Sequence, residues 1–204
     1  MGEARQECLT RCLKAIWDQH VPCEVLVAHD ESGTPNKTYN RLATIAQGSH
    51  MLILNDDCYV LPGFLQACEE AIQAHPEMDL GLTYLGTPGD PHLIRYLWEI
   101  PFACFPLLRT GLKLFDDSFP FYYVDQDLTF RVIDAGGCLV PIPGACLYHE
   151  AAPSPRRDIP DHPDCAVGWT RLAIRWHDIQ DDLRKKVKAL GVEFPATCNG
   201  NCLK

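Results

Sequence analysis

Apolar residues in this sequence follow two patterns, short continuous runs and helical spacing. The run Met51 to Leu54 predicts a strand buried on both faces, as in a parallel sheet covered by helices. Runs of the same kind predict further strands, and the full set is residues 24–28, 51–54, 80–85, 138–142 and 145–148. The opening run matters most, because it ends abruptly in three polar residues, Asn55, Asp56 and Asp57.

Other stretches repeat apolar residues every three or four positions, which predicts amphipathic helices. The first helix carries Leu9, Cys12 and Ile16 on one face and ends before Pro22. The helix that begins near Asp125 ends at the glycine pair Gly136-Gly137. The expected helices cover residues 9–17, 39–46, 64–72, 125–136 and 169–190. Residues 91–114 give no clear pattern, and the proline-rich residues 151–163 predict a loop. Strands that alternate with helices in one domain indicate a three-layer α/β fold with a mostly parallel sheet.

Composition narrows the class of protein. A chain of 204 residues with 47% hydrophobic content can form one substantial core. The formal charge of −9 argues against broad nucleic-acid binding, which needs a basic surface. No apolar run approaches the roughly 18 to 20 residues of a membrane span, and the polar first residues carry no signal-peptide core. We therefore expect a cytoplasmic protein without a transmembrane segment; association into a homo-oligomer is left open.

The eleven cysteines are scattered through the expected helices and strands, where small buried apolar residues are common. This distribution favours reduced thiols over a disulfide framework. Cys8 with Cys12 and Cys198 with Cys202 share one spacing, but it is not the tight spacing of a zinc knuckle. We expect no zinc site there.

The polar residues after the run Met51 to Leu54 admit two interpretations. In an extended chain, Asn55 and Asp57 point to one side and Asp56 to the other. At the carboxyl end of a strand, where ligands collect in open α/β sheets, such oxygen ligands suit Mg²⁺ or Mn²⁺. Alternatively, an aspartate here only caps the next helix. This stretch alone does not decide between a metal site and a cap.

A second group of candidate residues follows later in the chain. Asp125 and Asp127 stand at a predicted helix start, where carboxylates are favoured by the helix dipole and often serve as caps. Asp125 is better placed as a general base, whereas capping is an equal alternative for Asp127. His149 ends an apolar run and is a candidate metal ligand through its imidazole.

The order of these stretches resembles the family 2 glycosyltransferases of the GT-A fold, particularly their rhamnosyltransferase-like members, over roughly residues 5 to 180. Leu54-Asn55-Asp56-Asp57 looks like the DxD-type motif of the family. Val124-Asp125-Gln126-Asp127, followed by Leu128 and Arg131, looks like its ED-x-D-L-x-x-R segment. The resemblance implies one glycosyltransferase-like domain over residues 1–204, with a nucleotide-sugar and metal-binding core in 1–150 and a proline-rich loop and C-terminal helix in 151–204.

The resemblance also implies roles for individual residues. Asp125 would take the proton from the acceptor hydroxyl, and the metal, Mg²⁺ or Mn²⁺, would be held by Asp57, Asn55 and His149. The residues that would contact the substrate or nucleotide are Asp30, Ser32, Asn55, Asp56, Arg109, Asp127 and Arg131. The implied reaction is an inverting transfer of a hexose-type sugar from a nucleotide-sugar donor to a glycan, lipid-linked or protein acceptor.

Three positions depart from the pattern of the family. The family opens with a strand ahead of the first helix, and we expect the sheet to lack that strand here. Val124 stands where a glutamate is usual, and His29 and Glu31 replace an aspartate and a glycine in the turn after the second strand. These departures leave a second hypothesis open, a non-catalytic GT-A-like binding or scaffold protein that has lost donor binding. A sugar-nucleotidyltransferase is a weaker third hypothesis, because no glycine-rich basic loop is present.

Overall fold

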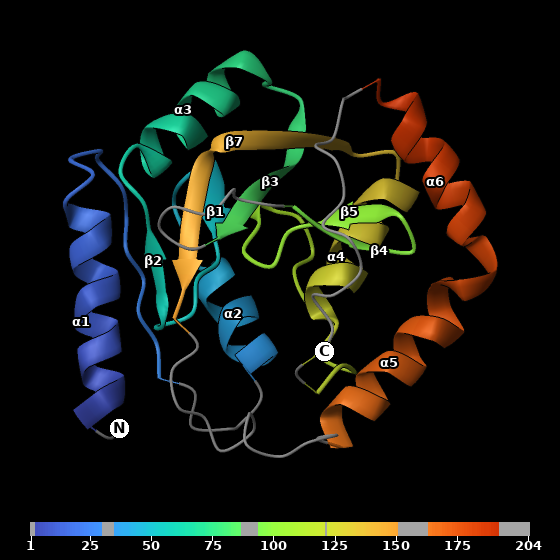
Figure 1. The fold of residues 1–204 in the computed structure, drawn as a ribbon, viewed down its shortest axis with the longest axis horizontal. Coiled ribbons are helices and arrows are strands. Elements are labelled where there is room, and N and C mark those ends of the chain that lie inside the picture. The colour runs from blue at the N-terminus through green and yellow to red at the C-terminus, as the bar shows by residue number, and fades with distance from the viewer. Residues whose placement is uncertain (1–2, 30–34, 87–93, 121, 151–162, 192–204) are drawn as a thin grey trace.

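A five-stranded mixed sheet in the order β1-β6-β3-β7-β2 forms the centre of the structure (Figure 1). The structure is a computed structural model and describes residues 3–29, 35–86, 94–120, 122–150 and 163–191. The strands are β1 (His50–Leu52), β2 (Cys58–Val60), β3 (Met78–Gly86), β4 (Arg95–Leu97), β5 (Ile100–Phe102), β6 (Leu107–Arg109) and β7 (Cys138–His149). Strands β4 and β5 pair with each other in a separate two-stranded ribbon.

Six α-helices surround the sheet within the described residues. They are α1 (Glu3–Trp17), α2 (Pro35–Ala43), α3 (Phe64–Ala74), α4 (Val124–Asp134), α5 (Pro163–Trp176) and α6 (Gln180–Ala189). In Figure 1, α1 lies at one side against β2, and α5 and α6 lie at the opposite side. The predicted helices are confirmed, although a 3-10 turn at His177–Ile179 divides the last one. None of the described helices has the length and apolar character of a membrane span.

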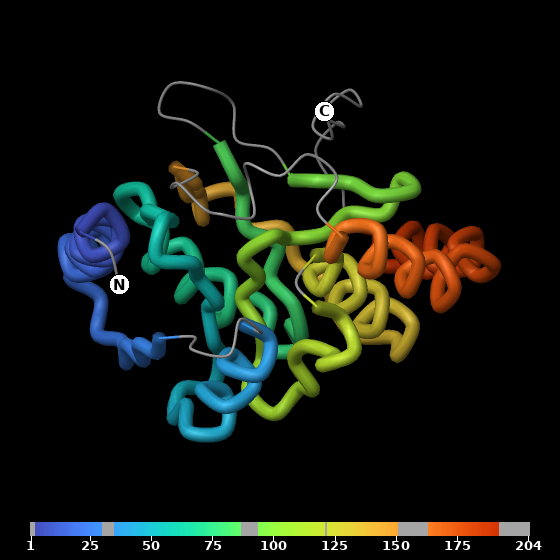
Figure 2. The backbone as a smooth tube through the Cα atoms, turned by 90° about the horizontal axis from the view of Figure 1, so that it is seen from below, coloured from blue at the N-terminus to red at the C-terminus, as the bar shows by residue number. Residues whose placement is uncertain are grey.

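Two apolar clusters fill the layers on either side of the sheet. One contains Leu82, Phe130 and Trp176 and joins the sheet to α4, α5 and α6. The other contains Phe64 and Leu147 and joins the sheet to α1 and α3. Figure 2 shows these helix layers from a direction at right angles to Figure 1. The sheet therefore has helices on both faces, as the α/β pattern predicts.

The strand directions differ from the prediction of a mostly parallel sheet. Among the described strands, β3 and β7 pair in parallel, whereas the β1–β6, β3–β6 and β2–β7 pairs are antiparallel. The antiparallel partners come from segments without a clear strand pattern: β6 from the aromatic and proline-rich stretch, and β2 directly after the turn that ends at Asp57. Residues 138–149 form one long irregular strand rather than the two short ones predicted.

The predicted buried strand at Glu24 to Ala28 is wrong. The segment is not assigned to a strand, and the side chains of Val25 and Val27 are 37% and 55% exposed. Within the described residues, the backbone of residues 21–29 forms no hydrogen bond with the backbone of another part of the chain. An apolar run has strand character only when a neighbouring strand pairs with it, and none does so here.

Strand β1 is a half-buried edge strand rather than the strand buried on both faces that the sequence predicts. Its residues His50, Met51 and Leu52 are all half-buried, and they pair with Arg109, Leu108 and Leu107 of β6. Within the described residues, β6 is the only strand that pairs with β1. The apolar run 51–54 therefore presents one unpaired edge.

Candidate functional site

The residues Asn55, Asp56 and Asp57 lie in the turn that connects β1 to β2. The turn is closed by the amide of Cys58, which donates a hydrogen bond to the Asn55 carbonyl over 3.2 Å. The sequence predicts an extended chain at Asn55 and Asp57, with both side chains on one side. This prediction is wrong, because β1 ends at Leu52. The alternative of a helix cap is also wrong, because α3 begins only at Phe64, after Gly63.

Strand β7 brings His149 to this turn. His149 is the register partner of Cys58, and its Nε2 lies 3.2 Å from Oδ1 of Asp57. Asp57 is only 5% exposed, and the His149 ring packs edge-on against Phe105 with 5.4 Å between the ring centroids. The structure therefore brings together two of the candidate metal ligands that are far apart in the sequence.

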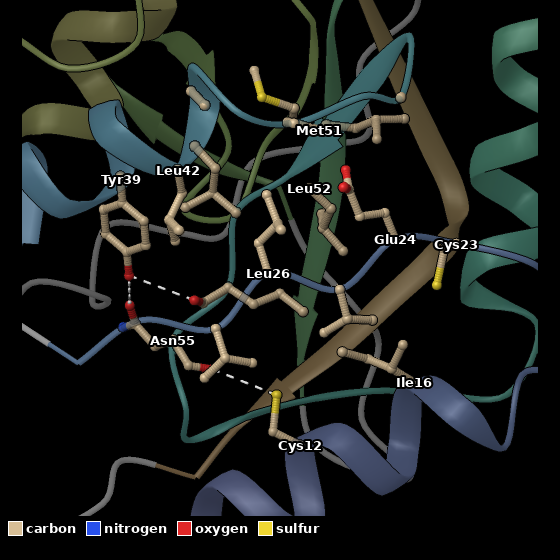
Figure 3. Close-up of a pocket in the computed structure, with 18 of the residues that line it drawn as sticks. Cys12, Ile16, Cys23, Glu24, Leu26, Tyr39, Leu42, Met51, Leu52 and Asn55 are labelled. Atoms are coloured by element: carbon tan, nitrogen blue, oxygen red, sulfur yellow. Dashed lines mark hydrogen bonds between the residues drawn. The ribbon is translucent and has the colours of Figure 1, made fainter.

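Asn55, the third candidate ligand, is oriented by α2. The hydroxyl of Tyr39 donates a hydrogen bond to Oδ1 of Asn55 over 2.7 Å, as Figure 3 shows. The Tyr39 ring packs edge-on against Phe115, which fixes the direction of its hydroxyl. Asn55 thus lies beside Asp57 in the same turn, with its side-chain oxygen bound to the protein.

Helix α1 adds positive charge that the sequence analysis did not identify. A guanidinium nitrogen of Arg5 lies 2.5 Å from Asp56 and 3.7 Å from Asp57. Burial raises the pKa of Asp56, and the charge of Arg5 opposes that rise. A second arginine, Arg11, pairs with Glu150 over 2.7 Å next to His149. The helical pattern predicts α1, but it gives no sign of which residues face the β1–β2 turn.

The side chains around Asp57 offer a compact set of metal-binding atoms. One ligand atom each from Asp57, Cys58 and His149 lies within 4.8 Å of the others. Burial raises the pKa of the Cys58 thiol, and the charge of Asp57 adds to the effect, so Cys58 is a poor ligand because binding requires the thiolate. The remaining carboxylate and imidazole fit a divalent cation such as Mn²⁺.

Asp125, the candidate base, stands in the first turn of α4. It is half-buried, and burial raises its pKa to about 6 from the ordinary 3.8. The Cys104 thiol donates a hydrogen bond to its carboxylate, and the charge of Arg95 also favours the ionised form. Cys104 precedes Phe105, whose ring contacts His149, so one short segment connects Asp125 to the Asp57 turn. A carboxylate with a pKa near 6 suits general base catalysis at neutral pH.

Asp127 and Arg131 hold the structure together rather than face a ligand. Asp127 is fully buried and accepts hydrogen bonds from Arg131 over 2.9 Å, Arg175 over 2.7 Å and Trp176 over 2.9 Å. It is not a cap, because the N-cap of α4 is Tyr123. Arg131 also donates hydrogen bonds to the carbonyls of residues 113 and 114. These contacts attach α5 to α4, and Asp127 has no exposed surface for a nucleotide.

Arg109, another predicted substrate residue, does not join the Asp57 turn. Arg109 pairs in register with His50, at the opposite end of β1, and contacts Asp79 and the carbonyls of Pro76 and Met78. Asp30 and Ser32, like the proline-rich loop, lie outside the described residues.

A cavity of about 1550 Å³ lies beside the Asp57 turn. Its walls come from α1, residues 21–29, α2 and β1, and Figure 3 shows Leu42 of α2 and Ile16 of α1 on opposite sides of it. Most of its surface is apolar, whereas Asn55, Asp56 and Asp57 contribute polar atoms.

Among the solved structures that are similar to this chain are two glycosyltransferase-fold proteins. One is S. aureus TarS 1-349, with 16% identity over 84% of this chain and 69% of that chain, and a TM-score of 0.54. The other is GalNAc-T7 with UDP, GalNAc and Mn²⁺, with 12% identity and a TM-score of 0.55; the match covers 95% of this chain but only 48% of GalNAc-T7. No family model and no curated protein matches the sequence. At these identities the likeness shows the fold, and this chain has the glycosyltransferase-like GT-A fold that the sequence resemblance implies.

Proposed function

We propose that this protein is a metal-dependent, inverting glycosyltransferase related to family 2. It would move a hexose-type sugar from a nucleotide-diphosphate donor to a hydroxyl of a glycan, lipid or protein acceptor. The observation that carries the proposal is the meeting of Asp57 and His149 at the β1–β2 turn, 3.2 Å apart, in a GT-A fold. The GalNAc-T7 structure contains UDP and Mn²⁺, which supports a nucleotide donor and a divalent cation for this chain.

The residues would divide the chemistry as follows. Asp57 and His149, with Asn55 beside them, would hold the divalent cation, which offsets the charge on the diphosphate of the donor. Asp125 would accept the proton of the acceptor hydroxyl as that oxygen forms its bond to the anomeric carbon and the nucleoside diphosphate leaves. Displacement from the opposite face inverts the anomeric centre.

A turnover assay tests the proposal. UDP-, GDP- and dTDP-sugars are supplied with Mn²⁺ and a panel of hydroxyl acceptors, and the released nucleoside diphosphate is measured. We expect release with one of these donors, and loss of release in Asp57→Ala and Asp125→Asn. Asp178→Asn is the matched control, because that carboxylate is 99% exposed on the distant 3-10 turn. Equal release by Asp125→Asn and the unsubstituted protein would refute the assignment of the base.

A non-catalytic GT-A-like binding or scaffold protein is the second candidate function. The ion pairs of Arg5 with Asp56 and Asp57 favour it, because they place a fixed positive charge where the cation would bind. This candidate predicts no nucleotide binding at millimolar UDP, GDP or dTDP with Mn²⁺. Calorimetric titration with the three nucleotides separates the two candidates.

A further inference from the structure

The cavity beside β1 is bordered by two stretches of backbone that have no partner strand on the cavity side within the described residues. Ser49 accepts a hydrogen bond from Thr110 over 2.9 Å, and Ile53 donates one to Pro106 over 3.5 Å, so both residues direct their backbone groups toward β6. Backbone groups alternate in direction along an antiparallel strand, so those of His50, Leu52 and Leu54 point to the opposite edge. There the Leu54 carbonyl accepts a hydrogen bond from the Tyr39 hydroxyl over 3.5 Å, and no strand pairs with this edge within the described residues. That edge faces the cavity, which these three residues help to line.

The opposite border of the cavity is the segment 21–29. It too has no backbone hydrogen-bond partner within the described residues, and all of its residues line the cavity. A side-chain contact, in which the Gln47 amide donates to Glu24 over 2.9 Å, holds one end of this segment close to β1. The cavity thus lies between two chain segments whose polar backbone groups need partners.

Apolar side chains cover the cavity from above and below the plane of the sheet. Met51 and Ile53 pack in the same cluster as Tyr39 and Ala43 of α2. The alternate residues Leu52 and Leu54 pack in the other cluster, with Ile16 of α1 and Leu65 and Ile72 of α3. A strand placed next to β1 would therefore be buried on both faces. Strands in that position are continuous runs of apolar residues, in most cases Val, Ile and Leu.

The size and charge of the cavity favour a peptide strand over a small molecule. Its volume of about 1550 Å³ exceeds the roughly 300 to 1,000 Å³ of typical small-molecule sites. The edge from His50 to Leu54 has only the Tyr39 hydroxyl as a partner, at the Leu54 carbonyl, and it offers about 16 Å of backbone, the length of about five residues. Two carboxylates, Glu24 and Glu69, also line the cavity, and they favour basic residues flanking the apolar run.

From these observations we propose that the cavity is a binding site for one β-strand of a partner polypeptide. The strand adds to the free edge of β1, and it consists of about five apolar residues with basic flanking residues. It occupies the space between β1 and residues 21–29, with α2 on one face of the sheet and α1 on the other. The proposal does not depend on sugar transfer, since the strand binds to backbone and apolar surface rather than to Asp57 or Asp125.

The test uses the full chain and a fluorescein-labelled synthetic peptide of five alternating valines and isoleucines flanked by lysines. The control peptide has the same sequence with N-methyl groups on alternate residues, which removes the hydrogen-bond donors and keeps the apolar surface. We expect the unmodified peptide to bind in fluorescence anisotropy, and the N-methylated peptide to bind at least about tenfold more weakly. Equal binding by both peptides would refute strand addition.

Amide hydrogen exchange locates the peptide. The peptide should slow exchange of His50, Leu52 and Leu54, whereas Met51, which pairs with β6, should change little. Leu26→Lys, which places a charge in the cavity, should abolish binding, whereas Ile174→Lys, at a side chain 81% exposed on α5, should leave it unchanged.

Three results would overturn the proposal. The first is protection from hydrogen exchange that is confined to residues away from β1. The second is displacement of the peptide by UDP with Mn²⁺, together with protection of the same β1 amides by the nucleotide, which would make the cavity a nucleotide site. The third is a concentration-dependent dimer, detected by sedimentation, that protects the β1 edge without peptide, since a second copy would then be the occupant. Peptide binding is measured without nucleotide, so a protein that binds the peptide but transfers no sugar refutes only the proposed function.

Discussion

Replacing Asp125 by asparagine should stabilise the protein at neutral pH while abolishing the proposed sugar transfer. The cause is the burial of the Asp125 carboxylate, which raises its pKa to about 6 from 3.8. A folded pKa above the unfolded value means that the folded protein binds the proton more tightly. The stability contributed by the protonated group is therefore fully present below pH 3.8 and is lost as the pH rises through 6.

The magnitude follows from the size of the shift. One pKa unit corresponds to about 1.4 kcal/mol, so the difference between 3.8 and about 6 gives an upper value of about 3 kcal/mol above pH 6. Because Asp125 is only half-buried, about 2 kcal/mol is the better expectation. Asparagine carries no charge, and its carbonyl oxygen keeps an acceptor for the Cys104 thiol.

The assay is urea unfolding of the unsubstituted protein and Asp125→Asn between pH 4 and pH 8. The two free energies of unfolding should agree near pH 4, diverge between pH 4 and pH 6, and then keep a constant difference of about 2 kcal/mol. Asp178→Asn, the exposed control, should shift stability by less than about 0.5 kcal/mol at every pH. A destabilised Asp125→Asn, or a difference that does not vary with pH, would refute the burial of a charged Asp125.

Three further predictions concern other parts of the structure. Asp127→Asn should destabilise the fold by about 3 kcal/mol in urea unfolding, because it leaves the Arg131 and Arg175 guanidiniums without their buried carboxylate. The control Asp134→Asn, at an exposed carboxylate, should lower the free energy of unfolding by less than about 1 kcal/mol. Equal losses in these two variants would refute the structural role of Asp127. Arg5→Ala should strengthen Mn²⁺ binding at least about fivefold in calorimetry, because a unit positive charge 3.7 Å from the Asp57 carboxylate opposes the cation by about 1 to 4 kcal/mol. Arg11→Ala, which removes a charge paired with Glu150, should not strengthen it. Weaker Mn²⁺ binding by Arg5→Ala would contradict the competition between Arg5 and the cation. Gly81→Ala should lower the free energy of unfolding by about 1 to 3 kcal/mol, because the added Cβ would lie 2.6 Å from Cδ1 of Ile142. An unchanged free energy of unfolding would contradict this close packing and show that the sheet relaxes freely there.

The helices of this protein can be predicted from the sequence because their apolar spacing is local. Strand pairing depends on distant segments, which is why the run 24–28 misled: its five residues have strand composition, yet no neighbouring strand pairs with them among the described residues. The same reason explains β6, whose residues 107–109 show no alternation but pair with both β1 and β3.

The candidate site was partly predictable. Asp57, His149 and Asp125 stand out as candidates in the sequence because each lies where an apolar run or a helix meets a polar turn, and the structure places Asp57 and His149 3.2 Å apart. Asp127 has the same sequence signal as Asp125, and only tertiary packing against Trp176 and Arg175 distinguishes them. Arg5 lies on a helix face that the amphipathic pattern assigns to no partner, so its contact with Asp56 could not be foreseen.

The central claim is that Asp57 holds a cation that binds a nucleoside diphosphate. The most direct measurement is calorimetric titration of the protein with UDP, in the presence of Mn²⁺ and again in the presence of a chelator. The account predicts UDP binding that requires Mn²⁺ and is lost in Asp57→Ala, while Asp178→Asn binds as the unsubstituted protein does. Equal UDP affinity in the Asp57→Ala variant and the unsubstituted protein, with or without Mn²⁺, would contradict it.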